Sequence, residues 1–513
     1  MASENLGSGV SANGPSFTPV MSPDIWHLVF DQIDSRRDLC NVCLTSRAWF
    51  TMATPHLYKI VPLAKRPHDL WHCENHKDPM RFARSLSSRL LNTGNESLRR
   101  AVHELDLGDF ITGKDLSEME ERLVALVDSL PNLRRVKIRS RLTHEVLRDL
   151  VGRGKPISLH LLDEDGRRPV EDDWPNVVAL AAQVCPSEER AGPNQDILGL
   201  QKLLFACPNL TSFSLSITGG YGGCMRTIPR FRNVYSFQFS GDEIFPPLEE
   251  LSLSGHRLSE EEWEHWRKGL QWSKLRSLAL GPRYMADFLK LAAGYANSLR
   301  NLEVQVYTDG DVNGKTHCPP LQHFLTTFTS LESLIVRGYH VPLGPIGHHS
   351  GLRDLCLHSF ELVKEGYLRP TLDVEQLQEL DKMCPDLQTL EIDLYRDGEW
   401  PEKILKRLAT GFRNLRRLTL HLEVGLDRKK CIHIEPKLNK DSAKEVGQEF
   451  FRWRSSTNLS VLVLKTGEPL RRFPQWHPKY SEFERENEYT IEVHRPGAPG
   501  DVPDVTFVDI PYF

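Results

Sequence analysis

The sequence contains no run of about 18 apolar residues, the length that a membrane-spanning helix needs. Its first residues have neither a basic start nor an apolar core, so we expect no secretory signal and no transit peptide. Cysteine is sparse, with 10 in 513 residues, which excludes a disulfide scaffold and favours buried thiols in a reducing compartment. These absences predict a cytoplasmic or nuclear protein.

Neither sign of charge is in excess, because 64 Lys and Arg stand against 69 Asp and Glu for a net charge of −5. This balance gives no general electrostatic reason to bind nucleic acid or an anionic membrane, and we expect neither as a partner. With 26% charged, 40% hydrophobic and 9% aromatic residues, the composition indicates a globular chain and excludes disorder throughout.

The motifs of common enzymes are also missing from the sequence. We find no Gly-x-Ser-x-Gly, no His-Glu-x-x-His and no dinucleotide-binding fingerprint. Cys40 and Cys43 could be combined with His72, Cys73 and His76 into a zinc site, but the second group lacks Cys-x-x-Cys spacing. We therefore predict no enzymatic activity, no cofactor and no metal site.

What the sequence does contain is a repeat of the form apolar-x-x-apolar-x-apolar. Copies occur at residues 102–107, 133–138, 210–215, 234–239, 248–253, 275–280, 299–304, 331–336, 352–357, 387–392, 415–420 and 459–464, with a weaker copy at 177–182. Between copies the apolar spacing becomes helical, so each unit is a helix, a sharp turn and a short strand. Strands separated by helices pair in parallel through right-handed crossovers. The sequence predicts an α/β fold, a curved solenoid with a parallel sheet on its concave side.

Alternation within the predicted strands identifies the side chains that face the concave surface, and serine is common among them. The candidate substrate-facing residues are Arg135, Lys137, Arg139, Ser212, Ser214, Ser216, Ser236, Gln238, Ser252, Ser254, Ser277, Glu303, Arg337, His358, Glu391 and Asp393. Hydroxyl groups could hydrogen-bond a protein target, with the charged ends fixing its direction. Serine would equally keep a crowded surface soluble, so composition leaves both interpretations open.

The segment from Met21 predicts three short helices. Ser22, Pro23 and Asp24 form a helix start, because a hydroxyl caps the first turn, proline suits its first position and a carboxylate favours its positive end. Apolar residues then recur at helical spacing, with polar breaks between the helices.

This segment resembles the F-box motif as it appears in fungal F-box proteins. The residues on matching positions are Pro23, Asp24, Ile25, Leu28, Val29, Ile33, Asp38, Leu39, Leu44, Arg47 and Trp49, whereas Met21 and Ser22 depart from the pattern. The remaining chain resembles the irregular leucine-rich repeats that many such proteins carry. The resemblance implies docking on the Skp-family adaptor of a cullin-RING ubiquitin ligase. The implied adaptor contacts are Pro23, Ile25, Leu28, Val29, Ile33, Leu39, Leu44 and Trp49.

The predicted organisation has five parts: a disordered tail at 1–20, an F-box at 21–62, a helical linker at 63–98, a leucine-rich-repeat-like solenoid at 99–465 and an irregular cap or tail at 466–513. Such a chain would be a non-enzymatic substrate receptor of an SCF-type ligase that holds an unknown protein target. Two alternatives stay open. The chain could be an interaction scaffold outside ubiquitin transfer, or the three helices could only shield the open end of the solenoid.

Overall fold

A computed structural model of the chain describes residues 22–33, 36–63, 79–107, 116–138, 144–162, 173–184, 195–217, 237–241, 243–281, 285–305, 318–338, 341–361, 369–426, 431–467, 483, 487–497 and 502–508. The predicted tail at 1–20, Arg139 and Ser236 lie outside the described residues, as do His72, Cys73 and His76. Within the described ranges, no helix is long and apolar enough to cross a membrane.

The chain forms two compact units. The first unit is built from the described residues among 1–66, 75–137 and 145–155, and the second from those among 138–144 and 156–513. The elements of the first unit are α1 (Pro23–Phe30), α2 (Arg36–Thr45), α3 (Arg47–Tyr58), β1 (Ile60–Pro62), α5 (Pro79–Leu91), η1 (Thr93–Asn95), α6 (Glu96–Ala101), β2 (Glu104–Asp106), α7 (Leu116–Ser129), β3 (Arg135–Ile138) and α8 (His144–Gly152). Strands β1, β2 and β3 pair in parallel, and α1 to α3 confirm the three predicted helices.

The second unit alternates strands with helices along most of its length. Its elements are β4 (Ile157–Leu162), β5 (Val177–Val184), α9 (Gln195–Ala206), β6 (Ser212–Ile217), β7 (Glu250–Ser254), α10 (Glu260–Gly269), η3 (Trp272–Lys274), β8 (Ser277–Leu280), α11 (Met285–Ala292), β9 (Asn301–Gln305), α12 (Pro319–Thr326), β10 (Ser333–Arg337), α13 (Leu343–Ile346), β11 (Asp354–His358), α14 (Val374–Met383), β12 (Thr389–Leu394), α15 (Glu402–Thr410), β13 (Arg417–Leu422), α16 (Lys440–Trp453), β14 (Val461–Thr466), β15 (Tyr489–His494) and β16 (Asp504–Phe507).

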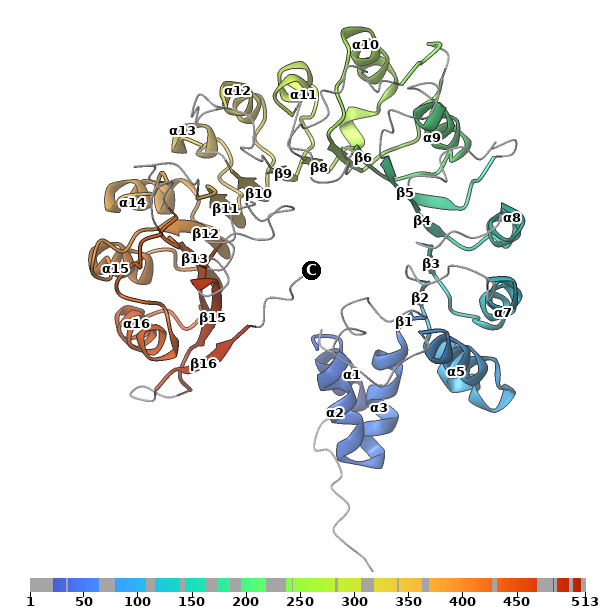
Figure 1. Ribbon diagram of the computed structural model, residues 1–513, viewed down its shortest axis with the longest axis horizontal. Coiled ribbons are helices and arrows are strands. Elements are labelled where there is room, and N and C mark those ends of the chain that lie inside the picture. Colours follow the sequence, from blue (N-terminus) through green and yellow to red (C-terminus); the bar gives the residue numbers. More distant parts are fainter. Residues whose placement is uncertain are drawn as a thin grey trace, which may run out of the picture. The chain divides into compact units, whose positions relative to one another are not determined.

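The strands of this unit pair in chain order, and β4 to β14 are all parallel. They form the concave side, and helices α9 to α16 form the outer side (Figure 1). The predicted α/β solenoid of the leucine-rich-repeat type is thus confirmed. The weaker repeat copy at 177–182 is also a strand, within β5.

Strands β3, β5, β6 and β12 begin after a turn that the sequence marks with proline followed by asparagine or aspartate. In the turn before β6, Cys207 is fully buried, and the N–H of Leu210 donates to its carbonyl at 3.1 Å. The side-chain amide of Asn209 donates to the carbonyl of Pro175 in the preceding repeat at 3.0 Å. Asn414 makes the same bond to Pro385 at 3.1 Å. These amides therefore join successive turns, which fixes the spacing between neighbouring repeats.

The sheet ends differently from its beginning. β14 pairs antiparallel with β15, and β15 pairs antiparallel with β16. Both strands lie in the region 466–513, which the sequence predicts as an irregular cap or tail.

The prediction of a strand at the repeat copy 234–239 is wrong for the residues of that copy that the structure describes, 237–239. β6 pairs directly with β7, and residues 237–240 are not in a strand. Phe237 and Phe239 instead pack against Trp266 of α10, with ring centroids 6.1 and 6.0 Å away. Phe237 is buried and Phe239 is half-buried, but both rings pack against a helix and not within a strand.

Substitutions on the two faces of a strand should lower the free energy of unfolding by very different amounts. Phe213 on β6 is fully buried, and Phe213→Ala should lower the free energy of unfolding of the second unit by about 3–5 kcal/mol. Ser214, the next residue, is half-buried on the other face, so Ser214→Ala should change it by less than about 0.5 kcal/mol. Denaturant unfolding measures both values. Equal losses would contradict the assigned orientation of β6.

Candidate protein-binding surfaces

The three helices α1 to α3 share a small aromatic core. Phe30 of α1, Leu39 of α2 and Ala53 of α3 are buried together. The ring of Trp49 lies edge-on to that of Trp26, with centroids 4.4 Å apart, and 5.4 Å from that of Phe30. These contacts hold α1 and α3 together through large apolar areas.

A second apolar face of the same helices is exposed. Ile25, Leu28 and Val29 share one side of α1 because they are three and four residues apart, and they are 47%, 67% and 41% exposed. Leu44 of α2 is 84% exposed and Phe50 of α3 is 50% exposed. A helix that only covers a core carries polar residues on its outer side. α1 is instead apolar on two faces, which is typical of a surface that meets a partner.

The implied adaptor contacts divide between these two faces. Ile25, Leu28, Val29 and Leu44 lie on the exposed face, and Pro23 is the first residue of α1. We reassign Ile33, Leu39 and Trp49 to the core, because Leu39 is buried and the other two pack against it.

Sequence reasoning missed Phe50 as an exposed apolar residue of this segment. Its position next to Trp49 was the available signal, since two aromatic residues in succession on a helix cannot both face the same core.

In the first unit, β3 carries two of the predicted basic residues. Arg135 is exposed, whereas Lys137 is half-buried with its ammonium group 2.7 Å from the carboxylate of Glu104 on β2. The charge of Lys137 is therefore balanced within the sheet.

In the second unit, serines line the concave side of three adjacent strands. They alternate with buried residues such as Phe213 and Leu215, so they lie on the face opposite the core. The register places Ser214 opposite Ser252 and Ser216 opposite Ser254. All of these serines are half-buried: Ser212, Ser214 and Ser216 on β6, Ser252 and Ser254 on β7, and Ser277 on β8. Glu303 on β9 is exposed beyond them.

Gln238 does not belong to this face, although the repeat pattern predicts it there. The side chain of Gln201 on α9 donates to the carbonyl of Gln238 and accepts from its N–H, both at 2.8 Å. These bonds hold the backbone of Gln238 beside a helix and not within the sheet. Its assignment as a concave strand residue is therefore wrong.

The concave side of β11 and β12 is covered by the chain itself. His358 and Asp393 occupy outward positions on these strands, yet both are buried. The N–H of Ser359 donates to the Asp393 carboxylate at 2.6 Å, and the guanidinium of Arg369 lies 3.1 Å from it. The prediction that His358 and Asp393 face a substrate is wrong, because residues 359–361 and 369–372, here called the covering segment, occupy that position.

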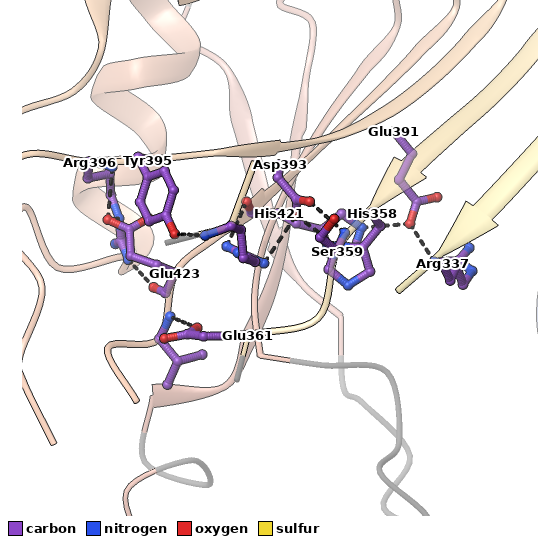
Figure 2. Close-up of polar contacts among 12 residues, drawn as sticks. Arg337, His358, Ser359, Glu361, Glu391, Asp393, Tyr395, Arg396, His421 and Glu423 are labelled. Atoms are coloured by element: carbon purple, nitrogen blue, oxygen red, sulfur yellow. Dashed lines mark hydrogen bonds and ion pairs between the residues drawn. The ribbon is translucent and has the colours of Figure 1, made fainter. Parts of the chain in front are cut away.

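Two stacked imidazoles lie at the centre of this buried cluster (Figure 2). The ring centroids of His358 and His421 are 3.7 Å apart. His358 Nδ1 lies 2.8 Å from Asp393, and His421 Nε2 lies 2.6 Å from Glu391. Arg337 of β10 also donates to Glu391, at 2.9 Å. The predicted substrate-facing residues Arg337 and Glu391 are thus bonded to each other and tie β10 to β12 and β13.

Glu361 also holds the covering segment in place. The buried carboxylate of Glu361 accepts the backbone N–H groups of Val424, Gly425 and Leu426 at 2.7, 2.8 and 2.7 Å. Charge-assisted bonds to three consecutive amides hold a carboxylate firmly. This part of the concave side is consequently closed.

The surroundings of His421 and Glu391 determine the protonation states of these two side chains. Burial, together with neighbouring His358, lowers the pKa of His421 to about 4, so this imidazole is neutral at pH 7. Burial alone would raise the pKa of Glu391, but the hydrogen bond from His421 and the charge of Arg337 outweigh it and hold that pKa below its usual range. Neutral His421 therefore donates from Nε2 to an ionised Glu391.

The cluster contains a thiol, imidazoles and carboxylates, which are the residue types of nucleophilic catalysis. A catalytic cysteine needs an accessible thiol with a lowered pKa. Cys356 is buried at the same place, and burial raises the pKa of its thiol. Among the residues that the structure describes, no group of three His, Cys, Asp or Glu side chains is placed to hold a metal ion. This cluster can stabilise the fold, but it has no activated nucleophile.

Sequence reasoning missed Glu361 and Arg369 as members of this cluster. Both lie between repeat copies, where no apolar period assigns a face to a side chain.

No protein-family model and no curated protein matches this chain. Among solved structures, the leucine-rich-repeat-containing protein LegL7 from Legionella pneumophila is 14% identical, with a TM-score of 0.27, over 83% of this chain and 96% of its own. The leucine-rich-repeat ectodomain of the receptor kinase GASSHO1/SCHENGEN3 from Arabidopsis thaliana, in complex with CASPARIAN STRIP INTEGRITY FACTOR 2, is 12% identical, with a TM-score of 0.20, over 72% of this chain and 51% of its own. At these scores neither likeness supports an argument about function.

The lowered pKa of His421 predicts an acid-sensitive second unit. As pH falls below 6.5, this histidine becomes protonated in the unfolded chain, whereas His421 in the folded chain becomes protonated only near pH 4. The folded state therefore loses stability between these two pH values. The loss at pH 5.0 should be about 2 kcal/mol. His421→Gln, whose amide can still donate to Glu391, should recover at least about half of that loss.

Hydrogen exchange of the β12 and β13 amides against pH measures this effect. The matched control is His323→Gln on α12, because His323 is exposed and should leave the pH dependence unchanged. An unchanged slope in His421→Gln would contradict the assignment.

Proposed function

We propose that this chain is the substrate-receptor subunit of an SCF-type cullin-RING ubiquitin ligase. The α1 to α3 segment binds a Skp-family adaptor, and through it the cullin, while the repeats bind a protein target. This function requires the cytoplasm or the nucleus.

The observation that carries the proposal is the set of exposed apolar residues on α1 to α3, namely Ile25, Leu28, Val29, Leu44 and Phe50. Four of these five residues are among the adaptor contacts that the F-box resemblance implies, and the fifth, Phe50, follows the implied contact Trp49 on α3. Burying such side chains in a partner releases roughly 25 cal/mol for each Å² of apolar area removed from water.

The target would bind the open part of the concave side, because the part over β11 and β12 is already occupied by the covering segment. On β6 to β8, small hydroxyl side chains leave space for the target and can hydrogen-bond it. Holding a target lysine close to the charged conjugating enzyme raises its effective concentration, so the chain itself needs no catalytic residue.

The interpretation of α1 to α3 as a simple cap accounts for only part of the segment. α3 contacts β1 and α6, so the segment does cover the neighbouring strand of the first unit. A cap needs no outward apolar face on α1, however, and the exposed fractions of Ile25 and Leu28 therefore favour a docking role.

A charge placed on the exposed face should separate docking from folding. We expect Leu28→Asp to weaken adaptor binding by roughly 100-fold or more, because it buries an unpaired carboxylate at the interface. The free energy of unfolding should change by less than about 0.5 kcal/mol, since Leu28 is exposed in the free chain. Titration calorimetry and denaturant unfolding measure the two quantities.

Two further variants serve as controls. Ile432→Asp changes an exposed isoleucine of the second unit and should affect neither quantity, whereas Leu39→Asp places a charge in the core and should abolish both. If Leu28→Asp behaves like either control, the docking surface is wrongly assigned.

Substrate-receptor function also predicts that the two binding activities separate. Full-length Leu28→Asp should retain a target protein and fail to support its ubiquitination in a reconstituted ligase. Ser214→Arg, which fills the serine-lined face, should reduce target binding and leave adaptor affinity within about twofold, because Ser214 is in the other unit. Adaptor binding without ubiquitin transfer to any bound target would favour the scaffold function instead.

A further inference from the structure

A chain of hydrogen bonds through two histidines joins α1 to α3. His27 Nδ1 lies 2.9 Å from His56 Nε2, and His56 Nδ1 lies 3.1 Å from the Asp31 carboxylate. The ammonium group of Lys59 lies 2.8 Å from the same carboxylate oxygen. His27 lies in α1 and Asp31 directly follows this helix. His56 lies in α3 and Lys59 directly follows that helix.

These distances fix how the protons are shared. An ionised Asp31 accepts from His56, so Nδ1 of His56 carries a hydrogen and its Nε2 is free to accept from Nδ1–H of His27. The hydrogen bond between the rings survives the addition of one proton, because one of the two facing nitrogens, His27 Nδ1 and His56 Nε2, still accepts. When both rings are protonated, each facing nitrogen carries a hydrogen, and the bond becomes a repulsion between two cations.

The other charged groups near the pair do not change between pH 7.5 and 5.5 in a way that would oppose this effect. The hydrogen bond and charge of Lys59 hold the pKa of Asp31 below its usual range, so Asp31 stays ionised. Burial, with the charges of Arg134 and Lys59, lowers the pKa of His103, whose backbone N–H donates to the carbonyl of Lys59 at 3.0 Å. Arg36 on α2 is engaged with the carbonyl of Ile60 at 2.6 Å.

We propose that the His27–His56 pair makes the docking surface sensitive to pH, so that mild acidification loosens α1 from α3 and weakens adaptor binding. The second half of this inference rests on the proposed function. His27 directly precedes Leu28 on α1, and the exposed face needs α1 held against α3 to present Ile25, Leu28 and Val29 together with Phe50.

The direction of the effect follows from linkage. Burial lowers the pKa of His56, with a smaller opposing contribution from its bond to Asp31. A histidine with a lowered pKa in the folded state contributes full stability above about pH 6.5, and that contribution is lost as pH falls further. The α1–α3 contact should therefore be weaker at pH 5.5 than at pH 7.5.

Hydrogen exchange of the free full-length chain tests the pH sensitivity of the α1–α3 contact without any adaptor. After correction for intrinsic exchange, the protection of α1 amides should fall roughly fivefold or more from pH 7.5 to 5.5. His27→Asn should reduce that fall, because the asparagine amide can donate to neutral His56, can turn its oxygen to accept from protonated His56, and carries no charge. The matched control, His103→Asn, should leave the fall in place.

Adaptor titration of the same proteins completes the test. The affinity of the native chain should fall by a similar factor over this pH range, and that of His27→Asn should fall by a smaller factor. Equal pH dependence of α1 protection in the native chain and His27→Asn would overturn the inference. Failure of the native chain to bind adaptor at pH 7.5 would overturn the proposed function and leave the exchange result as an independent measure of the histidine pair.

Discussion

One column of leucines sets the arrangement of the second unit. Leu278, Leu302, Leu334, Leu355 and Leu390 lie opposite one another across β8 to β12, and every one is buried. A one-residue slip in any pairing would turn the apolar set of that strand towards solvent, so burial of the column fixes the register. The same register decides which outward side chains meet. It brings serines together on β6 and β7 and brings carboxylates, imidazoles and an arginine together on β10 to β13.

The sequence predicts the parts of the fold that repeat. Apolar spacing identifies the strands, the helices between them and the turns marked by Pro208 and Asn209, because each feature follows from a local period or a local backbone preference. It fails at 234–239, where Phe237 and Phe239 match the spacing but pack on α10. It also misses the covering segment, since Glu361 bonds to residues more than sixty positions away and no local signal encodes such a contact.

The candidate surfaces show the same limit. On α1, apolar residues at helical spacing include both Phe30, which is buried, and Leu28, which is exposed, and periodicity alone cannot separate them when both faces are apolar. On β11 and β12, alternation correctly places His358 and Asp393 on the concave face, but only the tertiary structure shows that this face is covered. Exposure is thus a property of the whole fold, and it decides which predicted residues can meet a partner.

The central claim is that the outward apolar face of α1 to α3 binds a Skp-family adaptor. A hydrogen-exchange footprint of the full chain mixed with purified adaptor tests it most directly. We expect new protection in residues 23–30 and 44–50, around Leu28 and Phe50, with no change on the strands of the second unit. Protection confined to another part of the chain, or no protection while α1 to α3 remain folded, would contradict it.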